Sequence, residues 1–460
     1  MIGNVIFPEI VNLIEIRDFV TLKSVLDELL PQDIADLISD IPTPNEQAVV
    51  FRLVPKDAAT EIFEYLETDI QLNLLKALGN EEVSAILNDM SADDRTTLLE
   101  EVPASVAKEI LLKLSPDERK IAKTLLGYPE ESIGRLMTPD YVAVRSDWTV
   151  SQVLDHLREV GKKSETLDMI YVVNNKGILI DDIQIKEFLF APLHSTVDEL
   201  MDGNYIYLYV YDDQEKAVET FQKYALPAIP VTDNAGILIG IVTHDDVINV
   251  AQEEATEDFQ KFGAVEALDE PYAETPLFEM VRKRAGWLSI LFLGEMATAS
   301  AMAFYEHAIA KAVVLTLFIP LIISSGGNSG SQASTLVIRA LSLGEISLKE
   351  WWFVMKREII SGFLLGVILA LLGFFRIYVG EISSGAFGEH WFLLALTLGS
   401  TLIGIVMWGT VIGSMLPFIL KRLGFDPATS SAPFVATLVD VTGLVIYFTL
   451  ASLLLSGTLL

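Results

Sequence analysis

The chain has 460 residues, no cysteine, and 63 acidic against 32 basic side chains, giving a formal net charge of −31. The absence of cysteine excludes disulfide bonds and thiolate metal sites. Residues 1–275 hold 53 acids and 21 bases, whereas residues 276–460 hold ten acids and eleven bases. The acidic excess in residues 1–275 argues against nucleic acid as a partner and favours divalent cations. An equal alternative is that the surface is acidic to keep the protein soluble.

A repeat of 24 residues runs through residues 31–114. Segments that open with Pro31, Pro55 and Pro103 resemble one another, and isoleucine recurs at positions 38, 62, 86 and 110. Each unit is predicted to form two short helices with proline at a first helical position. Stacked units would make an all-α helical solenoid over residues 1–130, with acids such as Glu61 and Asp93 on its solvated outside.

Residues 134–251 carry a looser duplication in which strands alternate with amphipathic helices. Gly177-Ile178-Leu179 corresponds to Gly236-Ile237-Leu238, and the second copy continues with Gly240-Ile241-Val242-Thr243-His244-Asp245-Asp246. These motifs resemble a tandem pair of CBS domains, an α/β module that would occupy residues 131–250. The resemblance implies a cleft that can hold an adenine nucleotide such as ATP, with Thr243 and Asp246 contacting the ribose. The first copy departs from the motif, with Asp181, Gln184 and Glu187 at the Gly, Thr and Asp positions.

The segment 251–275 is rich in acids and contains a single basic residue, Lys261. We expect a helix that connects the α/β module to the first apolar segment. It is either a solvated linker or a connecting (plug) helix under a pore, with its carboxylates near those of the solenoid.

Five apolar segments follow, and each is long enough to span a membrane as a helix. They cover residues 287–306, 312–341, 353–379, 391–420 and 432–457. Nine Lys and Arg residues fall on one side of these segments, and only Lys311 and Arg376 fall on the other. The positive-inside rule therefore predicts a cytoplasmic N-terminal half and a C-terminus outside. No signal peptide is visible at the N-terminus.

Two features of the predicted membrane domain, residues 276–460, point to an ion pathway. The run Ser324–Gln332 places glycines, serines and amides inside the second segment, where it should loosen or break the helix and line a cavity. Close helix packing is the alternative interpretation of the glycines. Asp440 lies nine residues into the last segment, ~13 Å deep at ~1.5 Å per residue, and an ionisable residue at that depth predicts ion coordination. Glu295 in the first segment is a weaker candidate.

A hard dication fits this pattern. Mg²⁺ prefers oxygen ligands and usually keeps several waters, so one or two carboxylates with backbone carbonyls suffice to hold it. A single Asp440 in each chain suggests a two-fold dimer in which two copies face each other. Entry needs no pump, because a divalent ion gains ~4.6 kcal/mol per 100 mV of inside-negative potential.

The order of solenoid, CBS pair, acidic connector and five spans resembles the MgtE family of magnesium channels over essentially the whole chain. The most specific motifs are Gly326-Gly327-Asn328-Ser329-Gly330-Ser331-Gln332, Asp426-Pro427, and Pro433 to Gly443 around Asp440. The resemblance implies a homodimer whose pore is lined by the second and fifth spans. It also implies a cytoplasmic Mg²⁺ sensor with candidate carboxylates Glu61, Asp93, Asp213, Glu215, Asp245, Asp246, Glu257 and Asp258. Four positions that can be acidic or polar in relatives depart from that pattern, which implies a weaker sensor and a less discriminating pore entrance: Thr97, Ala225, Asn249 and Ala432.

The sequence thus predicts a multidomain membrane protein that takes up Mg²⁺ through a homodimeric channel gated by cytoplasmic Mg²⁺. The predicted pore residues are Gly326, Gly327, Asn328, Ala436 and Asp440. The expected setting is a bacterial inner membrane, with lipid as a partner and nucleic acid as none. An enzyme is not expected, because the five histidines show no metal-ligand spacing and no nucleophile–base pair is apparent. The alternatives are a broader Mg²⁺, Mn²⁺ or Co²⁺ channel or exchanger, and a membrane-anchored nucleotide sensor.

Overall fold

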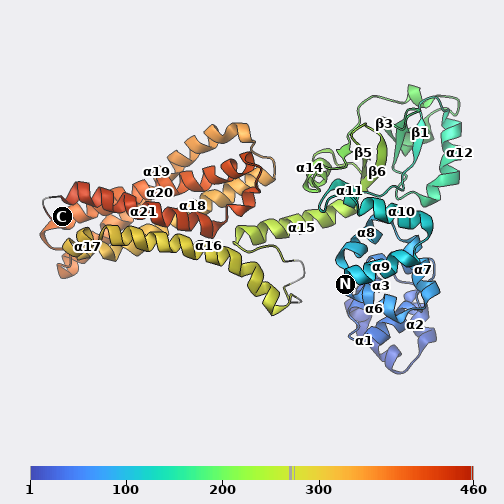
Figure 1. The fold of residues 1–460 in the computed structure, drawn as a ribbon, viewed down its shortest axis with the longest axis horizontal. Coiled ribbons are helices and arrows are strands. Elements are labelled where there is room, and N and C mark those ends of the chain that lie inside the picture. The colour runs from blue at the N-terminus through green and yellow to red at the C-terminus, as the bar shows by residue number, and fades with distance from the viewer. Residues whose placement is uncertain (1, 269–271, 274, 457, 459–460) are drawn as a thin grey trace. The chain divides into compact units, whose positions relative to one another are not determined.

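The computed structural model describes residues 2–268, 272–273, 275–456 and 458. It divides into two compact units that meet in sequence between Ala251 and Gln252. Figure 1 shows the N-terminal unit as short helices followed by two small sheets, and the C-terminal unit as a bundle of long helices.

The N-terminal unit begins with the predicted helical solenoid. The isoleucines of the 24-residue repeat are all buried, so the repeat marks the core face of successive helices. Pro31 is the first residue of helix α3, as predicted. In the other two units the helix begins after the proline: α5 begins at Ala59, and Pro103 is the N-cap residue that precedes α9. The helices are α1 Ile2–Glu15, α2 Phe19–Leu26, α3 Pro31–Ser39, α4 Pro44–Phe51, α5 Ala59–Glu64, α6 Thr68–Ala77, α7 Asn80–Asp89, α8 Ala92–Glu101, α9 Ala104–Lys113 and α10 Pro116–Leu125.

The last solenoid helices pack against the second sheet. Ala92 and Leu125 share a buried cluster with Ile229 and Val231 of that sheet. This contact corrects one prediction: Asp93 was expected on the solvated outside, but its side chain is only 6% exposed because α8 lies against the α/β module. Glu61 does remain exposed.

The α/β module consists of two similar halves. Each half has a three-stranded sheet whose first two strands are parallel and whose third is antiparallel. The halves meet at equivalent turns, where Leu179 N donates to Gly236 O and Leu238 N donates to Gly177 O, both at 3.0 Å. The elements are α11 Ile133–Leu136, β1 Ala143–Arg145, α12 Val150–Val160, η1 Gly161–Lys163, β2 Met169–Val173, β3 Leu179–Gln184, α13 Ile185–Phe190, η2 Val197–Glu199, β4 Leu208–Tyr209, α14 Glu215–Tyr224, β5 Ala228–Thr232 and β6 Leu238–Thr243.

Helix α15, His244–Phe262, starts in the N-terminal unit and continues into the C-terminal one. It is shorter than the helix predicted over residues 251–275. Gly263 follows its last residue and Ala264 takes a positive φ of 58°, a local conformation that stops a helix. Residues 269–271 and 274 of the predicted connector lie outside the described residues.

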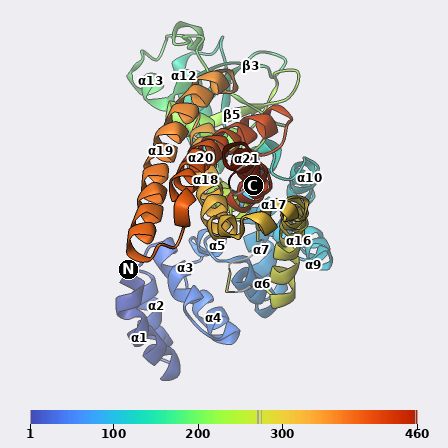
Figure 2. The same cartoon turned by 90° about the vertical axis from the view of Figure 1, so that its left-hand side faces the viewer.

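Five helical segments of the C-terminal unit are long and apolar enough to cross a membrane, as the sequence predicted. Helix α20 packs along both α19 and α18, and α21 lies against α18, as the end-on view of Figure 2 shows. The elements are α16 Leu277–Phe304, α17 Glu306–Lys311, η3 Val313–Phe318, α18 Ile319–Ser342, η4 Leu348–Glu350, α19 Trp351–Ser384, η5 Gly388–His390, α20 Trp391–Arg422, η6 Pro427–Thr429 and α21 Ala432–Leu455.

The glycine-rich run does not break the second span, which corrects that expectation. Helix α18 continues through it, and the Ser325 hydroxyl donates to the Leu321 carbonyl at 2.6 Å within the same helix. The glycines instead allow two helices to approach closely. A Cβ placed on Gly409 of α20 would lie 2.5 Å from the Gly326 carbonyl oxygen, and one on Gly413 would overlap the carbonyl of Gly330. Backbone contact of this kind stabilises an apolar helix pair.

Candidate functional site

Asp440 on α21 lies next to Gly327, a residue of α18 that has no side chain. A Cβ built on Gly327 would lie 3.3 Å from the Ala436 Cβ and 3.5 Å from the Asp440 Oδ1. Because Gly327 has no side chain, its backbone, the Ala436 methyl group and the Asp440 carboxylate border the same small space. Asp440 and Ala436 are one helical turn apart, so α21 presents both on one face. This arrangement places a carboxylate beside backbone that no side chain covers.

The other two predicted pore residues are placed differently. Gly326 is buried, and a Cβ on it would overlap Ile405 of α20 and lie 2.8 Å from Val439, so its position serves helix packing. Asn328 is exposed on α18, and its Nδ2 donates to the Ser324 hydroxyl at 3.3 Å. Of the four residues predicted beside Asp440, the structure brings Gly327 and Ala436 to it.

Helix α16 places a second carboxylate near the first. Gly294 packs directly against Thr437, and the Trp287 ring lies 6.4 Å from that of Phe434, so α16 runs alongside α21. At this level Glu295 is close enough to Asp440 for the two carboxyl groups to interact. Two adjacent acids within apolar helices form a site that attracts a cation.

A second group of acids gathers in the N-terminal unit, where the solenoid meets the α/β module. We call it the acidic cluster. Asp93 Oδ1 is buried and has no hydrogen-bond partner among the described residues, and Asp93 and Asp246 interact across the two subdomains. The Ser91 backbone N–H donates to Glu64 at 2.8 Å. The members are Glu64, Asp93, Asp94, Glu165, Asp245 and Asp246.

Burial raises the pKa values of five carboxyl groups of the acidic cluster, and neighbouring carboxylates raise them further: Glu64, Asp93, Asp94, Glu165 and Asp246. The pKa of Glu64 rises to about 8, first through burial and then through the charges of Asp94 and Asp93. The pKa of Glu165 rises to about 7, through burial and the charges of Asp93 and Asp245. Burial followed by the charge of Asp94 raises the pKa of Asp93, and burial followed by the charge of Asp93 raises the pKa of Asp246. The raised pKa values mean that the acidic cluster disfavours further negative charge near neutral pH, a cost that a bound dication would offset.

We predict that the N-terminal unit without Mg²⁺ loses stability as pH rises from 5 to 8. Folding raises the pKa of Glu64 above the ordinary glutamate value of about 4.3, so the folded state holds more protons across this window. Its contribution is at most about 1.4 kcal/mol per pH unit, and that of the partly solvated Glu165 is smaller. Calorimetry of the full chain in EDTA should show the lower-pH sample melting higher. Added Mg²⁺ should stabilise the pH 8 sample more, and equal stabilisation at both pH values would contradict the prediction.

Only part of the predicted sensor lies in the acidic cluster. Asp93, Asp245 and Asp246 belong to it, whereas Glu61 is an exposed residue of α5. Asp213 accepts from the Glu215 N–H at 2.9 Å in the turn before α14. Sequence reasoning missed Glu64, Asp94 and Glu165. Asp94 adjoins Asp93 in the first turn of α8 and could have been included, but no pattern marked Glu64 or Glu165.

Glu257 and Asp258 take part in a different contact, within the C-terminal unit. Lys261 forms ion pairs with Glu257 on its own helix and with Asp426, at 2.9 Å, between α20 and α21. The Ser342 hydroxyl donates to Asp258 at 3.4 Å. Burial acts to lower the pKa of Lys261, but its hydrogen bonds to Glu257 and Asp426 outweigh this and raise the pKa above its ordinary value. The lysine thus joins the second half of α15 to the helical bundle.

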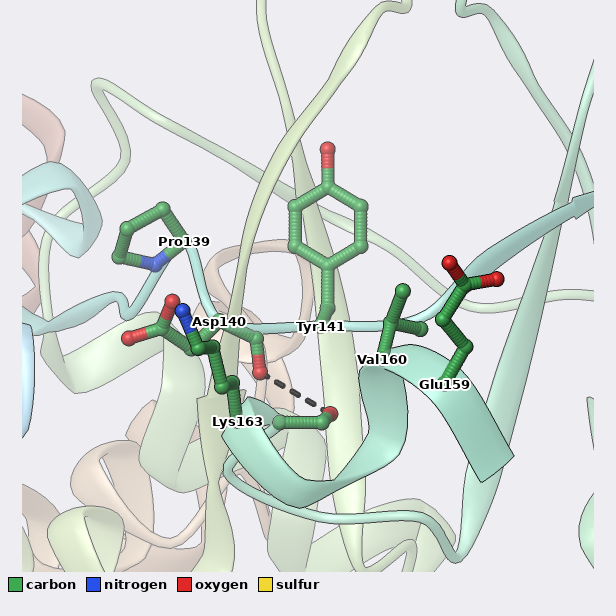
Figure 3. A pocket seen from close by; sticks show the side chains of 7 residues that line it. Pro139, Asp140, Tyr141, Glu159, Val160 and Lys163 are labelled. Atoms are coloured by element: carbon green, nitrogen blue, oxygen red, sulfur yellow. Dashed lines mark hydrogen bonds between the residues drawn. The ribbon is translucent and has the colours of Figure 1, made fainter. Parts of the chain in front are cut away.

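The two predicted nucleotide residues, Thr243 and Asp246, contact each other. The Thr243 hydroxyl donates to Asp246, which faces Asp93 in the acidic cluster. Figure 3 shows a pocket of about 300 Å³ in the first half of the module, where the Ser164 hydroxyl donates to the Asp140 carbonyl at 3.1 Å. Its lining residues are Pro139, Asp140, Tyr141, Glu159, Val160, Lys163 and Ser164.

No three His, Asp or Glu side chains in the described part of the chain are arranged to ligate a metal ion directly.

The chain is similar to known proteins along nearly its full length. Residues 319–450 match the MgtE divalent cation transporter family, residues 12–131 match the MgtE intracellular N domain, and residues 133–190 and 197–253 match the CBS domain. The magnesium transporter MgtE of Thermus thermophilus is 39% identical over 339 residues, which cover 74% of this chain and 73% of that protein.

Two solved structures resemble the N-terminal part. The soluble part of a magnesium transporter is 23% identical with a TM-score of 0.51, covering 55% of this chain and 99% of that one. The cytosolic domain of the Mg²⁺ channel MgtE in complex with ATP is 34% identical with a TM-score of 0.48, covering 50% of this chain and 93% of that one.

Proposed function

The chain belongs to the MgtE family of magnesium transporters, and from this premise we propose that it is a homodimeric Mg²⁺ channel gated by cytoplasmic Mg²⁺. As a family member it is a multi-pass membrane protein that transports Mg²⁺, and it is not an enzyme. The observation that carries the proposal is the Asp440 carboxylate, held inside the helical bundle against the bare backbone of Gly327.

Asp440 would bind a hydrated Mg²⁺ ion on its way through the bundle. Glu295 adds negative charge nearby, and an ion that keeps most of its water shell needs few further protein ligands. Binding through water is weak enough for the ion to leave again, which conduction requires. The inside-negative potential of a bacterial inner membrane would draw the ion inward.

A second copy of the chain would complete the pore. Each chain supplies one Asp440, and a two-fold axis beside it would bring two carboxylates to one ion. The membrane-spanning window of α16 is only 6% buried within one chain, which leaves an apolar surface for lipid or a second copy. The basic residues at one end of the spans favour a cytoplasmic N-terminal unit and a C-terminus outside.

The acidic cluster would act as the cytoplasmic sensor. Two carboxylates 4 Å apart repel by ~4 kcal/mol at an effective dielectric of 20, so several close pairs can bias a two-state element. When Mg²⁺ is scarce, this repulsion loosens the contact between the solenoid and the α/β module. When Mg²⁺ is abundant, hydrated ions bridge the carboxylates, and the compact arrangement closes the pore through α15. The ion pairs of Lys261 give that helix a direct connection to the bundle.

We predict that Asp246→Asn weakens inhibition by Mg²⁺ while leaving conduction intact. At a given distance the attraction between a dication and a carboxylate is twice the repulsion between two carboxylates, so loss of the ligand outweighs relief of repulsion. Mg²⁺ influx into proteoliposomes, with Mg²⁺ varied on the N-terminal side, should show an inhibition midpoint about fivefold higher or more.

The matched control is Asp155→Asn, which removes an exposed carboxylate of the same unit that pairs only with Arg158 at 2.7 Å among the described residues. This variant should keep the wild-type midpoint. An unchanged midpoint in Asp246→Asn would move the sensor away from the acidic cluster. Influx measured with Mn²⁺ and Co²⁺ separates a magnesium channel from the broader divalent channel.

A further inference from the structure

An apolar pocket of about 260 Å³ lies where α19 begins and α20 ends. Its floor belongs to a buried cluster in which Val354, Met415 and Phe418 pack against Val337 and Leu341 of α18. Its rim includes exposed apolar side chains, since Ile419 and Trp351 are about half exposed. The lining residues are Leu348, Trp351, Met355, Met415, Phe418, Ile419 and Arg422.

The pocket has one charged wall. Arg422 ends α20 and lines the pocket, and among the described residues no acidic side chain forms an ion pair with it. Lys421 precedes Arg422 in the sequence. On α19, Lys356 lies one helical turn after Trp352, with its Nζ 5.2 Å from the Trp352 ring centroid. The nearest acid on the η4 turn, Glu350, accepts hydrogen bonds from Ser347 instead. The mouth of the pocket is therefore cationic, whereas its interior is apolar.

The position of the pocket indicates what it meets. It lies at the ends of two membrane-spanning segments, beside adjacent exposed tryptophans at positions 351 and 352. Tryptophan and arginine at the end of an apolar helix are typical of the level of the lipid headgroups. At that depth an apolar pocket opens toward acyl chains, and a cation at its mouth opens toward phosphates.

We propose that this pocket binds an anionic glycerophospholipid, with its phosphate at Arg422 and part of an acyl chain among Met355, Met415 and Phe418. A guanidinium pairs with phosphate in a bidentate geometry. Methionine side chains adapt to irregular, flexible ligands. Basic pockets between membrane helices bind acidic lipid headgroups by the same chemistry. Arg422 also lies four residues before Asp426, the partner of Lys261, so a bound lipid would steady the loop that holds α15.

Native mass spectrometry of the full-length protein in detergent tests this proposal. The protein is titrated with phosphatidylglycerol or with phosphatidylcholine of identical acyl chains, and the retained lipid is counted. We expect preferential retention of phosphatidylglycerol, and a loss of about tenfold in its affinity in Arg422→Gln. Arg376→Gln is the matched control, because Arg376 lies 25 residues beyond Trp351 along α19, about 37 Å away. It should retain phosphatidylglycerol as the wild type does.

A second variant tests the apolar part separately. Met415→Trp fills the pocket while leaving Arg422 in place, and it should reduce retention of both lipids. Gel filtration and thermal unfolding verify that each variant is folded; if Met415→Trp unfolds, Met355→Trp replaces it on the opposite wall. Equal retention of both lipids by the wild type would overturn the proposal. Full displacement of the lipid by millimolar inorganic phosphate or glycerol 3-phosphate would also overturn the proposal, because it would indicate a site that binds phosphate alone. Wild-type retention in Arg422→Gln and in the pocket-filling variant would show that a second copy of the chain or another surface accounts for the lipid.

Discussion

Asp440→Ala is expected to abolish Mg²⁺ influx into proteoliposomes, with a loss of at least about 100-fold. A dication inside a bundle of apolar helices needs negative charge to replace part of its lost hydration. Alanine removes the carboxylate that borders Gly327 and Ala436 and leaves Glu295 as the one remaining acid beside it among the described residues. The measurement is Mg²⁺ uptake followed with an indicator trapped inside the vesicles.

Two further variants make this result specific. Asp440→Asn keeps the shape of the side chain and should also fail to conduct, because the charge and not the volume binds the ion. Glu389→Ala removes a carboxylate from the η5 turn of the same unit and should conduct as the wild type does. Substantial influx through Asp440→Ala would place the ion pathway elsewhere in the bundle.

Gly413→Ala should be the most disruptive single-methyl change in the membrane unit. A Cβ at this position would overlap the carbonyl group of Gly330, and backbone atoms cannot rotate away as a side chain can. Helices α18 and α20 must therefore separate. Overpacking of this kind costs about 3 kcal/mol, which corresponds to a melting temperature lower by about 5–10 °C. Because α18 carries Gly327, we also expect lower Mg²⁺ influx per folded molecule. Thermal unfolding in detergent and uptake normalised to folded protein measure the two effects.

Gly404→Ala is the matched control on the same helix. A Cβ there would lie 3.7 Å from the nearest atom, a methyl group of Ile446, which is ordinary van der Waals contact. This variant should melt within a few degrees of the wild type and conduct normally. If both alanine variants were equally stable, the close approach of α18 and α20 would not be what sets the position of Gly327.

Taken together, these predictions assign separate tasks to the two units. We propose that the helical bundle supplies the carboxylate that binds the ion, and that the N-terminal unit supplies a crowded group of acids that responds to the same ion. Helix α15 belongs to both units in sequence, and Lys261 fastens its second half to the bundle. In the proposed function α15, which is continuous in sequence across the two units, carries the response of the acidic cluster to the pore.

The sequence by itself was sufficient for features that repeat along the chain or depend on composition. Hydropathy located the five spans, because about 20 apolar residues are needed whatever their neighbours are. The 24-residue spacing of isoleucine identified the buried face of the solenoid, because a helix repeats its core positions at a fixed period. Asp440 could be singled out because a carboxylate is rare inside an apolar membrane-spanning segment.

Contacts between distant segments were decided only by the tertiary structure. Asp93 was expected in solvent, since its own helix pattern carries no sign of the α/β module that buries it. The glycine-rich run was expected to break α18, but it stays helical. Its glycines pack closely against Gly409 and Gly413 of α20, some 80 residues later in the sequence. Glu64 and Glu165 are about 100 residues apart, and no local period relates them to the acidic cluster. The period of a helix is a property of neighbouring residues, whereas burial and charge crowding depend on which surfaces fold against each other.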